Sequence, residues 1–198
     1  MIRTALLVAA AYLIGSIPTG YLVVRRLRGS DLRTLESGSV GALNAFRATG
    51  AQWAGWLVLA VDVLKGAAAV LIAGPGAGVW LQGALATAAV AGHNWPIWLR
   101  GRGGKGLATA AGSLSLVTPL AVPFWGMLWG LGYVATGYIV VGTLVATVLV
   151  TPLVGVVAGW GMGLAMLPAC LLILSRHADK LRRLAGGKEP RHYWRSHS

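Results

Sequence analysis

Seven long apolar stretches, separated by glycines, prolines and clusters of positive charge, constrain the fold of this chain more than any other feature. They cover residues 4–24, 51–73, 79–99, 107–117, 120–135, 138–158 and 160–175. Most approach the roughly 20 residues that an α-helix needs to cross a bilayer core. Only 11% of the 198 residues are charged, against about a quarter in soluble domains. The pattern predicts an all-α integral membrane protein with about seven transmembrane helices.

The composition excludes several other classes of protein. A hydrophobic fraction of 56% is incompatible with intrinsic disorder. Cys170 is the only cysteine, so a disulfide scaffold or a cysteine-based zinc site within one chain is excluded. Asp62 is the only acidic residue inside a predicted span. We therefore expect no metal ion and no cofactor.

The net charge of +12 is concentrated in three blocks. Fifteen of the seventeen cations lie within residues 25–47, 100–105 and 176–195, and only Arg3 and Lys65 lie elsewhere. In a protein with seven spans, all three blocks fall on the same side of the membrane. By the positive-inside rule, this predicts an external N-terminus and a cytoplasmic C-terminus. The expected organisation is one transmembrane domain, residues 1–175, followed by a basic cytoplasmic tail, residues 176–198.

The first basic loop has the composition of a phosphate cradle. Glycines leave backbone N–H groups accessible, short hydroxyl and amide side chains add donors, and an arginine can bind two phosphate oxygens. The residues concerned are Ser37, Gly38, Ser39, Gly41, Asn44 and Arg47. The alternative is an interfacial loop in which glycine supplies flexibility and arginine supplies only orientation.

The second basic loop strengthens the phosphate interpretation. His93 and Asn94 precede a glycine-rich turn, with Gly103, Gly104, Lys105 and Gly106, that leads into a predicted helix. A glycine turn at a helix N-terminus collects backbone donors and the positive end of the helix dipole. The turn is not a Walker A loop, since Gly106 stands where a magnesium-binding hydroxyl would be needed. For His93 alone, a structural interfacial histidine remains the alternative.

Polar and small residues within the spans predict contacts between helices. Asp62 and Lys65 are three residues apart and so share one helix face; because buried charges are costly in a membrane, we expect both to point inward, as supporting residues or as a purely structural pair. The pairs Gly126 with Gly130 and Gly155 with Gly159 are interpreted as helix-packing faces.

Together these motifs resemble a known family, the bacterial integral-membrane glycerol-3-phosphate acyltransferases of the PlsY type, which use acyl phosphate as donor. The resemblance covers nearly the whole chain. It rests on GSIPTGY at 15–21, SGSVGALNAFRATG at 37–50, DVLKG at 62–66, GHNWPIWLRGRGGKGLAT at 92–109, and Arg176-His177 before the basic tail with Gly186 and Glu189.

The resemblance implies an acyltransferase of phospholipid biosynthesis in the bacterial cytoplasmic (inner) membrane, with its site facing the cytoplasm. Its substrates would be acyl phosphate and glycerol 3-phosphate, with membrane lipid as a further partner and no nucleic acid. The implied catalytic residues are Ser37, Arg47, Lys105 and His93. His177 joins the glycines, Ser39, Asn44 and Asn94 as a phosphate-binding residue.

Two other functions remain as alternatives. Basic loops and broken glycine-rich helices would also suit an anion channel or transporter. A catalytically impaired relative acting as a scaffold is the second alternative, because the chain departs from the family pattern at Ser39, Leu43, Gly137, Val140, Asp179 and Lys180. Acyl-chain preference, oligomeric state and a contact between the tail and an acyl-phosphate synthase stay open. His192, Tyr193, Trp194 and His197 could form an interfacial anchor or part of a disordered tail.

Overall fold

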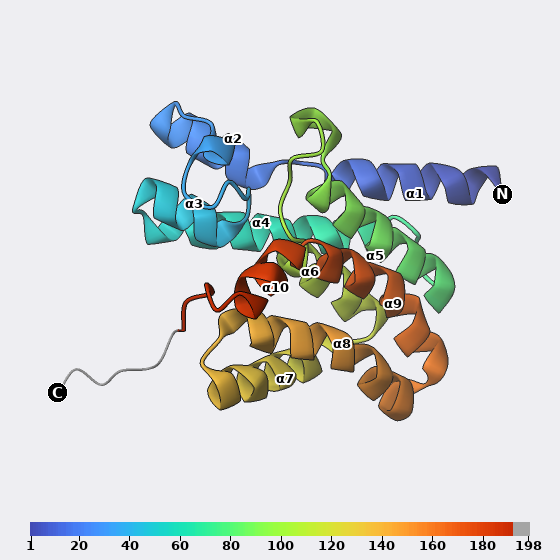
Figure 1. Ribbon diagram of the computed structural model, residues 1–198. Helices are drawn as coiled ribbons and strands as arrows, with labels where there is room; N and C mark the ends of the chain where they lie inside the picture. The colour runs from blue at the N-terminus through green and yellow to red at the C-terminus, as the bar shows by residue number, and fades with distance from the viewer. Residues whose placement is uncertain (192–198) are drawn as a thin grey trace.

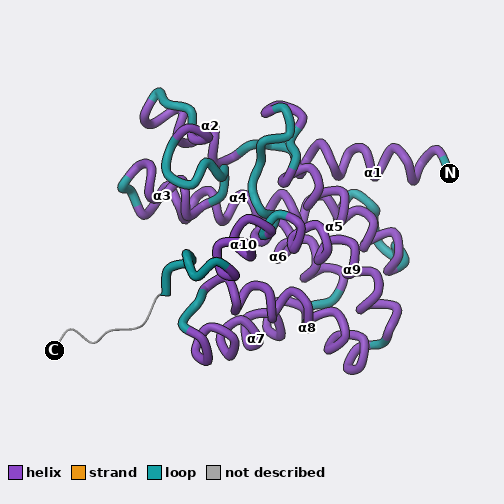
Figure 2. Tube along the Cα trace, viewed as in Figure 1, coloured by secondary structure: helices purple, strands orange, loops and turns teal. Residues whose placement is uncertain are grey.

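The computed structural model describes residues 1–191, and within them every regular element is helical (Figure 2). The expected interfacial anchor at His192–His197, together with Arg195, lies outside the described residues. The α-helices are α1 Ile2–Gly15, α2 Thr19–Arg28, α3 Ala42–Thr49, α4 Gln52–Leu71, α5 Val79–Asn94, α6 Leu107–Val117, α7 Ala121–Thr136, α8 Ile139–Ala158, α9 Trp160–Ser175 and α10 Ala178–Ala185. Two 3-10 turns, η1 Leu32–Thr34 and η2 Ile97–Leu99, complete the list for this part of the chain. The all-α prediction is confirmed.

The long helices lie within a few residues of the predicted apolar stretches, with two differences at prolines. The first stretch is divided at Ser16–Pro18 into α1 and α2, since proline has no N–H group to continue the helix. The third ends at Asn94 rather than Leu99, because the residue before Pro96 avoids helical angles. Trp95 accordingly has φ −131° and ψ 66°.

Two short helices occupy segments that the sequence analysis treated as loop and tail. α3 begins directly after Gly41 and ends at Gly50, whose positive φ of 69° closes the helix. α10 follows α9 after a bend of 56°. Figure 1 shows α2 and α3 at the end of the molecule away from the N-terminus, and α10 nearer the middle, close to α6.

Glycines set the closest helix crossings. A side chain at Gly15 or Gly92 would collide with the backbone of the facing helix where α1 crosses α5, and one at Gly66 or Gly112 would do so where α4 crosses α6. Small residues allow helices this close in a membrane, where packing rather than the hydrophobic effect drives association.

The predicted packing role of two other glycine pairs is only partly correct. Gly155 packs against the ring of Trp160 and the backbone of Gly163. In contrast, a side chain added at Gly126, Gly130 or Gly159 would meet no atom of the described chain within 4 Å. The prediction for Gly126 and Gly130 is wrong within this chain, because their face of α7 points away from the neighbouring helices.

By length and composition, three helical segments of the described chain could cross a membrane: Ile2–Arg28, Gln52–Leu71 and Ile139–Ala158. The bent pair formed by α9 and α10 would make a fourth. α5, α7 and α9 have 16 residues each, fewer than the 18 residues of a full-length span. A 16-residue helix still rises about 24 Å. The described chain is thus helical, with apolar helices of the length and composition that suit a membrane.

Candidate functional site: a basic cleft beside an apolar pocket

A polar cleft of about 260 Å³ lies where the three basic segments of the sequence meet. Its lining comes from the loop before α3, the loop before α6, and the junction of α9 with α10. The residues are Ser37, Gly38, Ser39, Gly103, Lys105, Ser175, Arg176, Ala178, Asp179 and Arg182. Of the predicted site residues, five belong to this lining: Ser37, Gly38, Ser39, Gly103 and Lys105.

Asn44 holds the first wall together rather than facing the cleft. Its buried side-chain oxygen accepts hydrogen bonds from the backbone N–H and the hydroxyl of Ser37, both at 3.0 Å. Its amide nitrogen donates to the carbonyls of Leu35 and Ser39, at 3.2 and 2.7 Å. Gly38 adopts a positive φ of 69° between them. One side chain thus determines the shape of the loop that carries Ser37 and Ser39, while Gly41 caps α3.

The glycines of the second wall are required by the close approach of α5. A side chain at Gly103 would collide with the His93 carbonyl and the Pro96 ring, and one at Gly104 would collide with the His93 imidazole. Gly106 has φ +83° and faces the Asn94 amide. The N–H of Gly104 already donates to the His93 carbonyl at 3.0 Å. Any phosphate held here would therefore bind other groups of the loop, such as Lys105 and the free N–H groups at the start of α6.

Lys105 is the predicted catalytic cation that the structure places in the cleft lining. Burial, and next to it the charge of Lys180, lowers the pKa of Lys105 to about 8, while the charge of Glu189 acts in the opposite direction. An anion bound beside Lys105 would reverse this shift. The cleft is therefore an environment that favours a negatively charged ligand.

The third wall contains residues that the sequence analysis did not select. Arg176 donates from Nε to the Gly104 carbonyl at 3.1 Å and from Nη2 to the Gly103 carbonyl at 3.3 Å. Arg182 and Asp179 form a loose exposed ion pair, 3.6 Å apart. The sequence signal for these two arginines is the cluster of cations after residue 175. The positive-inside rule explains that cluster by membrane orientation alone, so the sequence analysis assigns it to topology and not to the site.

His177, which the family resemblance implies as a phosphate-binding residue, does not line the cleft. Its ring is buried, and Nδ1 lies 2.8 Å from the Ile173 carbonyl of α9. It therefore packs back onto its own helix.

Asp62 and Lys65 form the inward-pointing pair that was predicted, with a separation of 2.7 Å between carboxylate and ammonium. Lys65 Nζ also donates at 2.8 Å to the Ile17 carbonyl, which the break between α1 and α2 exposes. His93 Nδ1 lies 3.8 Å from the same Asp62 carboxylate. Asn94 reaches α9, where it donates to the Leu172 carbonyl at 3.3 Å. These four side chains are buried behind the second wall and support it.

Arg47 is the one predicted catalytic residue that remains outside this arrangement. It lies exposed on α3, three residues after Asn44, and does not line the cleft. No hydrogen bond or ion pair restrains its guanidinium within the described residues.

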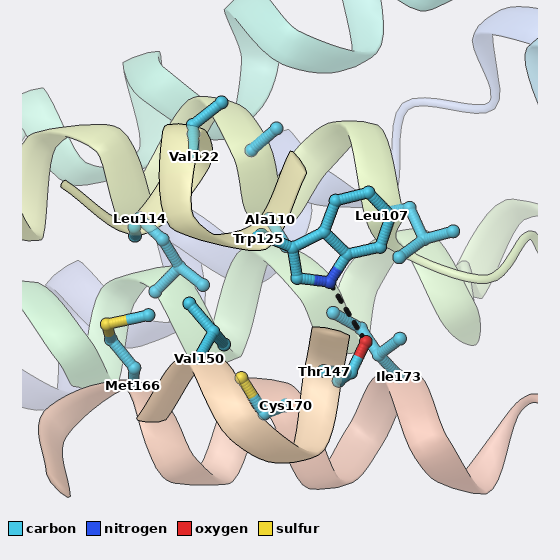
Figure 3. Close-up of a pocket in the computed structure, with 12 residues that line it drawn as sticks. Leu107, Ala110, Leu114, Val122, Trp125, Thr147, Val150, Met166, Cys170 and Ile173 are labelled. Carbon is cyan, nitrogen blue, oxygen red and sulfur yellow. Dashed lines mark hydrogen bonds between the residues drawn. The ribbon is translucent and has the colours of Figure 1, made fainter. Parts of the chain in front are cut away.

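The structure also has a second, apolar pocket of about 90 Å³ (Figure 3). It lies among α6, α7, α8 and α9, and Trp125, Met166 and Cys170 are among its lining. Trp125 Nε1 donates to the Thr147 hydroxyl at 3.1 Å, which satisfies the indole N–H inside the apolar surroundings. Leu107 of this pocket lies two residues after Lys105 of the cleft, and Ile173 lies two residues before Ser175. Residues at or directly before the start of α6, and residues at the end of α9, therefore contribute to the lining of both cavities.

The departures from the family pattern fall unevenly on this geometry. Ser39 and Asp179 line the cleft. Lys180 lies beside it, 3.6 Å from the Glu189 carboxylate. Leu43 is exposed, Val140 is buried in α8, and Gly137 closes α7 with a positive φ of 74°. None of these last three lines the cleft.

Comparison with known proteins gives a consistent result. Residues 5–187 match the family model described as glycerol-3-phosphate acyltransferase. A glycerol-3-phosphate acyltransferase of Parasynechococcus marenigrum is 40% identical, over 96% of this chain and 91% of the relative. Glycerol-3-phosphate acyltransferase 2 of Moorella thermoacetica is 42% identical, over 93% and 95% of the two chains.

Two solved structures of the integral membrane glycerol 3-phosphate acyltransferase PlsY have the same fold. The glycerol 3-phosphate form has a TM-score of 0.85 and 34% identity, and covers 96% of both chains. The lysophosphatidic acid form has a TM-score of 0.82 and 32% identity, over 96% of this chain and 95% of the other.

Proposed function

This chain belongs to the glycerol-3-phosphate acyltransferase family, and we propose that it transfers an acyl group from acyl phosphate to the 1-hydroxyl of glycerol 3-phosphate. The products are lysophosphatidic acid and inorganic phosphate. The observation that carries the proposal is that a basic cleft and an apolar pocket are lined by residues only two positions apart at the start of α6, Lys105 and Leu107. An anion with an acyl chain can place its charge beside Lys105 and its chain beside Leu107.

Acyl phosphate fits the residue inventory better than acyl-coenzyme A. The HxxxxD dyad of coenzyme-A-dependent acyltransferases is absent, since Trp98 stands five residues after His93 and Arg182 five after His177. A mixed anhydride is already activated. The hydroxyl oxygen attacks the acyl carbon, the bond from that carbon to the phosphate oxygen breaks, and the leaving phosphate accepts the hydroxyl proton. The enzyme then mainly holds two anions in position.

Each wall of the cleft contributes to that task. Lys105 and the first N–H groups of α6 bind phosphate. Ser37 lines the cleft from a loop that Asn44 shapes, where its hydroxyl donates to the Asn44 side-chain oxygen. Arg47 is unrestrained within the described residues and lies exposed in the last turn of α3, the helix that follows the same loop. It swings toward the second phosphate when substrate arrives. His93, Asn94, Asp62 and Lys65 act by supporting the wall that carries Lys105.

We further propose seven spans, with the cleft facing the cytoplasm of a bacterial inner membrane. Contacts between the predicted internal connections support this topology. Arg33 of the first basic loop donates to the Leu99 carbonyl of the second at 3.3 Å. Arg176 joins the second loop to the tail, and Arg191 of the tail donates to the Tyr138 hydroxyl between α7 and α8 at 2.8 Å. The exposed cations of α10 would then face a soluble enzyme that delivers acyl phosphate.

The proposal is tested with purified protein, glycerol 3-phosphate and one acyl chain presented either as phosphate or as coenzyme A thioester. We expect lysophosphatidic acid from the acyl phosphate only. Comparable rates with the thioester would overturn the donor assignment. Absence of turnover with both would favour the impaired relative, and phosphate flux through protein-containing liposomes would favour the transporter.

A further inference from the structure

We propose that Arg176 is a positioning residue that fixes the Gly103–Lys105 segment and thereby places Lys105 in the cleft. The inference rests on the proposed function for its kinetic consequence, but not for its structural one. It concerns a residue at the junction of α9 and α10, more than 70 positions away from the loop on which it acts.

The geometry is that of a clamp on a flexible backbone. The Arg176 guanidinium bonds two successive carbonyls, those of Gly103 and Gly104. On the opposite side, the Gly104 N–H bonds the His93 carbonyl of α5. Glycine loses more conformational freedom on ordering than any other residue, so a two-glycine segment needs such external bonds to keep one shape. Lys105 follows the clamped peptide directly.

The guanidinium is itself held in place. It stacks over the Trp95 ring, 5.6 Å from the ring centroid, a contact that favours arginine. The Trp95 carbonyl accepts a hydrogen bond from the Tyr12 hydroxyl of α1 at 2.7 Å. A chain of contacts therefore runs from α1 through Trp95 and Arg176 to the glycine segment.

The clamp also corrects an electrostatic problem. Carbonyl oxygens that face the cleft would repel a phosphate group. Because Arg176 occupies the carbonyls of Gly103 and Gly104, their negative ends are neutralised, and Arg176 still has N–H groups to spare. A lysine would keep the positive charge but has no planar fork to bond both carbonyls at once. This difference separates a positioning role from a simple contribution of charge.

The kinetic test compares Arg176→Ala and Arg176→Lys, with Arg182→Ala as the matched control. Arg182 lines the same cleft, but none of its side-chain bonds in the described chain reaches the second loop. Misplacing a catalytic group by about 1 Å can cost on the order of 10²-fold in rate. We expect both Arg176 variants to lower kcat by at least about 10-fold, and Arg182→Ala mainly to raise KM for glycerol 3-phosphate. Recovery of normal kcat by Arg176→Lys would overturn the proposal in favour of charge alone.

A second measurement does not depend on turnover. Trypsin can cut the loop after Arg100, Arg102 and Lys105. We expect Arg176→Ala and Arg176→Lys to accelerate cleavage after Lys105 severalfold in detergent, as followed by mass spectrometry, while Arg182→Ala leaves it at the wild-type rate. Equal cleavage rates in all four proteins would overturn the proposal. If Arg176→Ala does not stay folded by its thermal transition, Arg176→Lys alone decides the comparison. An inactive wild type would refute the proposed function, yet accelerated cleavage would still support the clamp.

Discussion

At the scale of single residues, the cleft depends on Lys105, whose pKa is lowered, and on Asn44, whose side-chain amide forms hydrogen bonds through both its oxygen and its nitrogen. Lys105 lies partly buried, next to Arg176 and near Lys180, so its environment works against its own charge until an anion binds. Asn44 uses both ends of its amide to order the loop of Ser37. The first residue is therefore sensitive to pH, and the second to the exact hydrogen-bonding type of its side chain.

We expect kcat/KM to fall as pH rises through about 8, because Lys105 loses its proton around that pH in the free enzyme. The sign follows from the charge type: a base is cationic below its pKa, so phosphate attraction is present at pH 7 and lost by pH 9. Arg176→Lys retains this alkaline limb, whereas Lys105→Arg, whatever its absolute rate, should lose it. A limb unchanged in Lys105→Arg would show that another group titrates.

Asn44→Asp should damage the site although it preserves shape. A carboxylate would face the carbonyls of Leu32, Leu35 and Ser39, to which the amide nitrogen now donates. Each buried group left unsatisfied costs about 1–3 kcal/mol. Thermal unfolding in detergent should shift down by several degrees, with a loss of kcat/KM. Ser30→Ala is the control and should leave both close to wild type, because within residues 1–191 the Ser30 hydroxyl bonds only the carbonyl of Arg28, the last residue of α2.

At the scale of elements, glycine contacts decide how closely helices approach. α4 and α6 cross with Gly66 against the Thr109 carbonyl and Gly112 against the Val63 carbonyl. The glycine turn with Lys105 leads directly into α6. This crossing therefore also sets the position of Lys105. Gly126 and Gly130 of α7, in contrast, meet no neighbour in the described chain, whereas Gly132 faces the backbone of Gly142 in α8.

Gly66→Ala and Gly112→Ala should each destabilise the protein by about 1–3 kcal/mol, the usual cost of overpacking. Gly126→Ala is the matched control: its added methyl meets open space, and alanine is favoured in a helix. Thermal transitions in detergent provide the measurement. Equal transitions for Gly112→Ala and Gly126→Ala would mean that the crossing relaxes at no cost.

At the scale of the whole molecule, the three basic segments converge although they are far apart in the chain. Arg33 reaches the second loop, and Arg176 reaches it from the opposite direction. An arrangement with these connections on opposite sides of a membrane would separate the walls of the cleft. The cleft therefore forms only if all three basic segments lie on the same side of the membrane.

Single cysteines at exposed positions test that topology. Arg28→Cys, Arg102→Cys and Lys188→Cys should be shielded from a membrane-impermeant thiol reagent in intact cells, whereas Pro75→Cys, in the uncharged connection between α4 and α5, should react. The native Cys170 is buried and provides a low background. External labelling at Arg102→Cys would require a different number of spans.

The order of the long helices, their approximate bounds away from Pro18 and Pro96, their apolar character and the family were determined by the sequence alone, because apolar runs and glycine motifs are local signals. Folding decided which polar residues share the cleft. Asn44 and His177 are residue types that often bind phosphate. In this fold their side chains instead bond nearby backbone carbonyls, so both have a structural role. Arg176 carries only charge in the sequence, and its bonds to Gly103 and Gly104 exist because α9 ends beside the second loop. Such contacts depend on where distant segments meet in space, which no local pattern encodes.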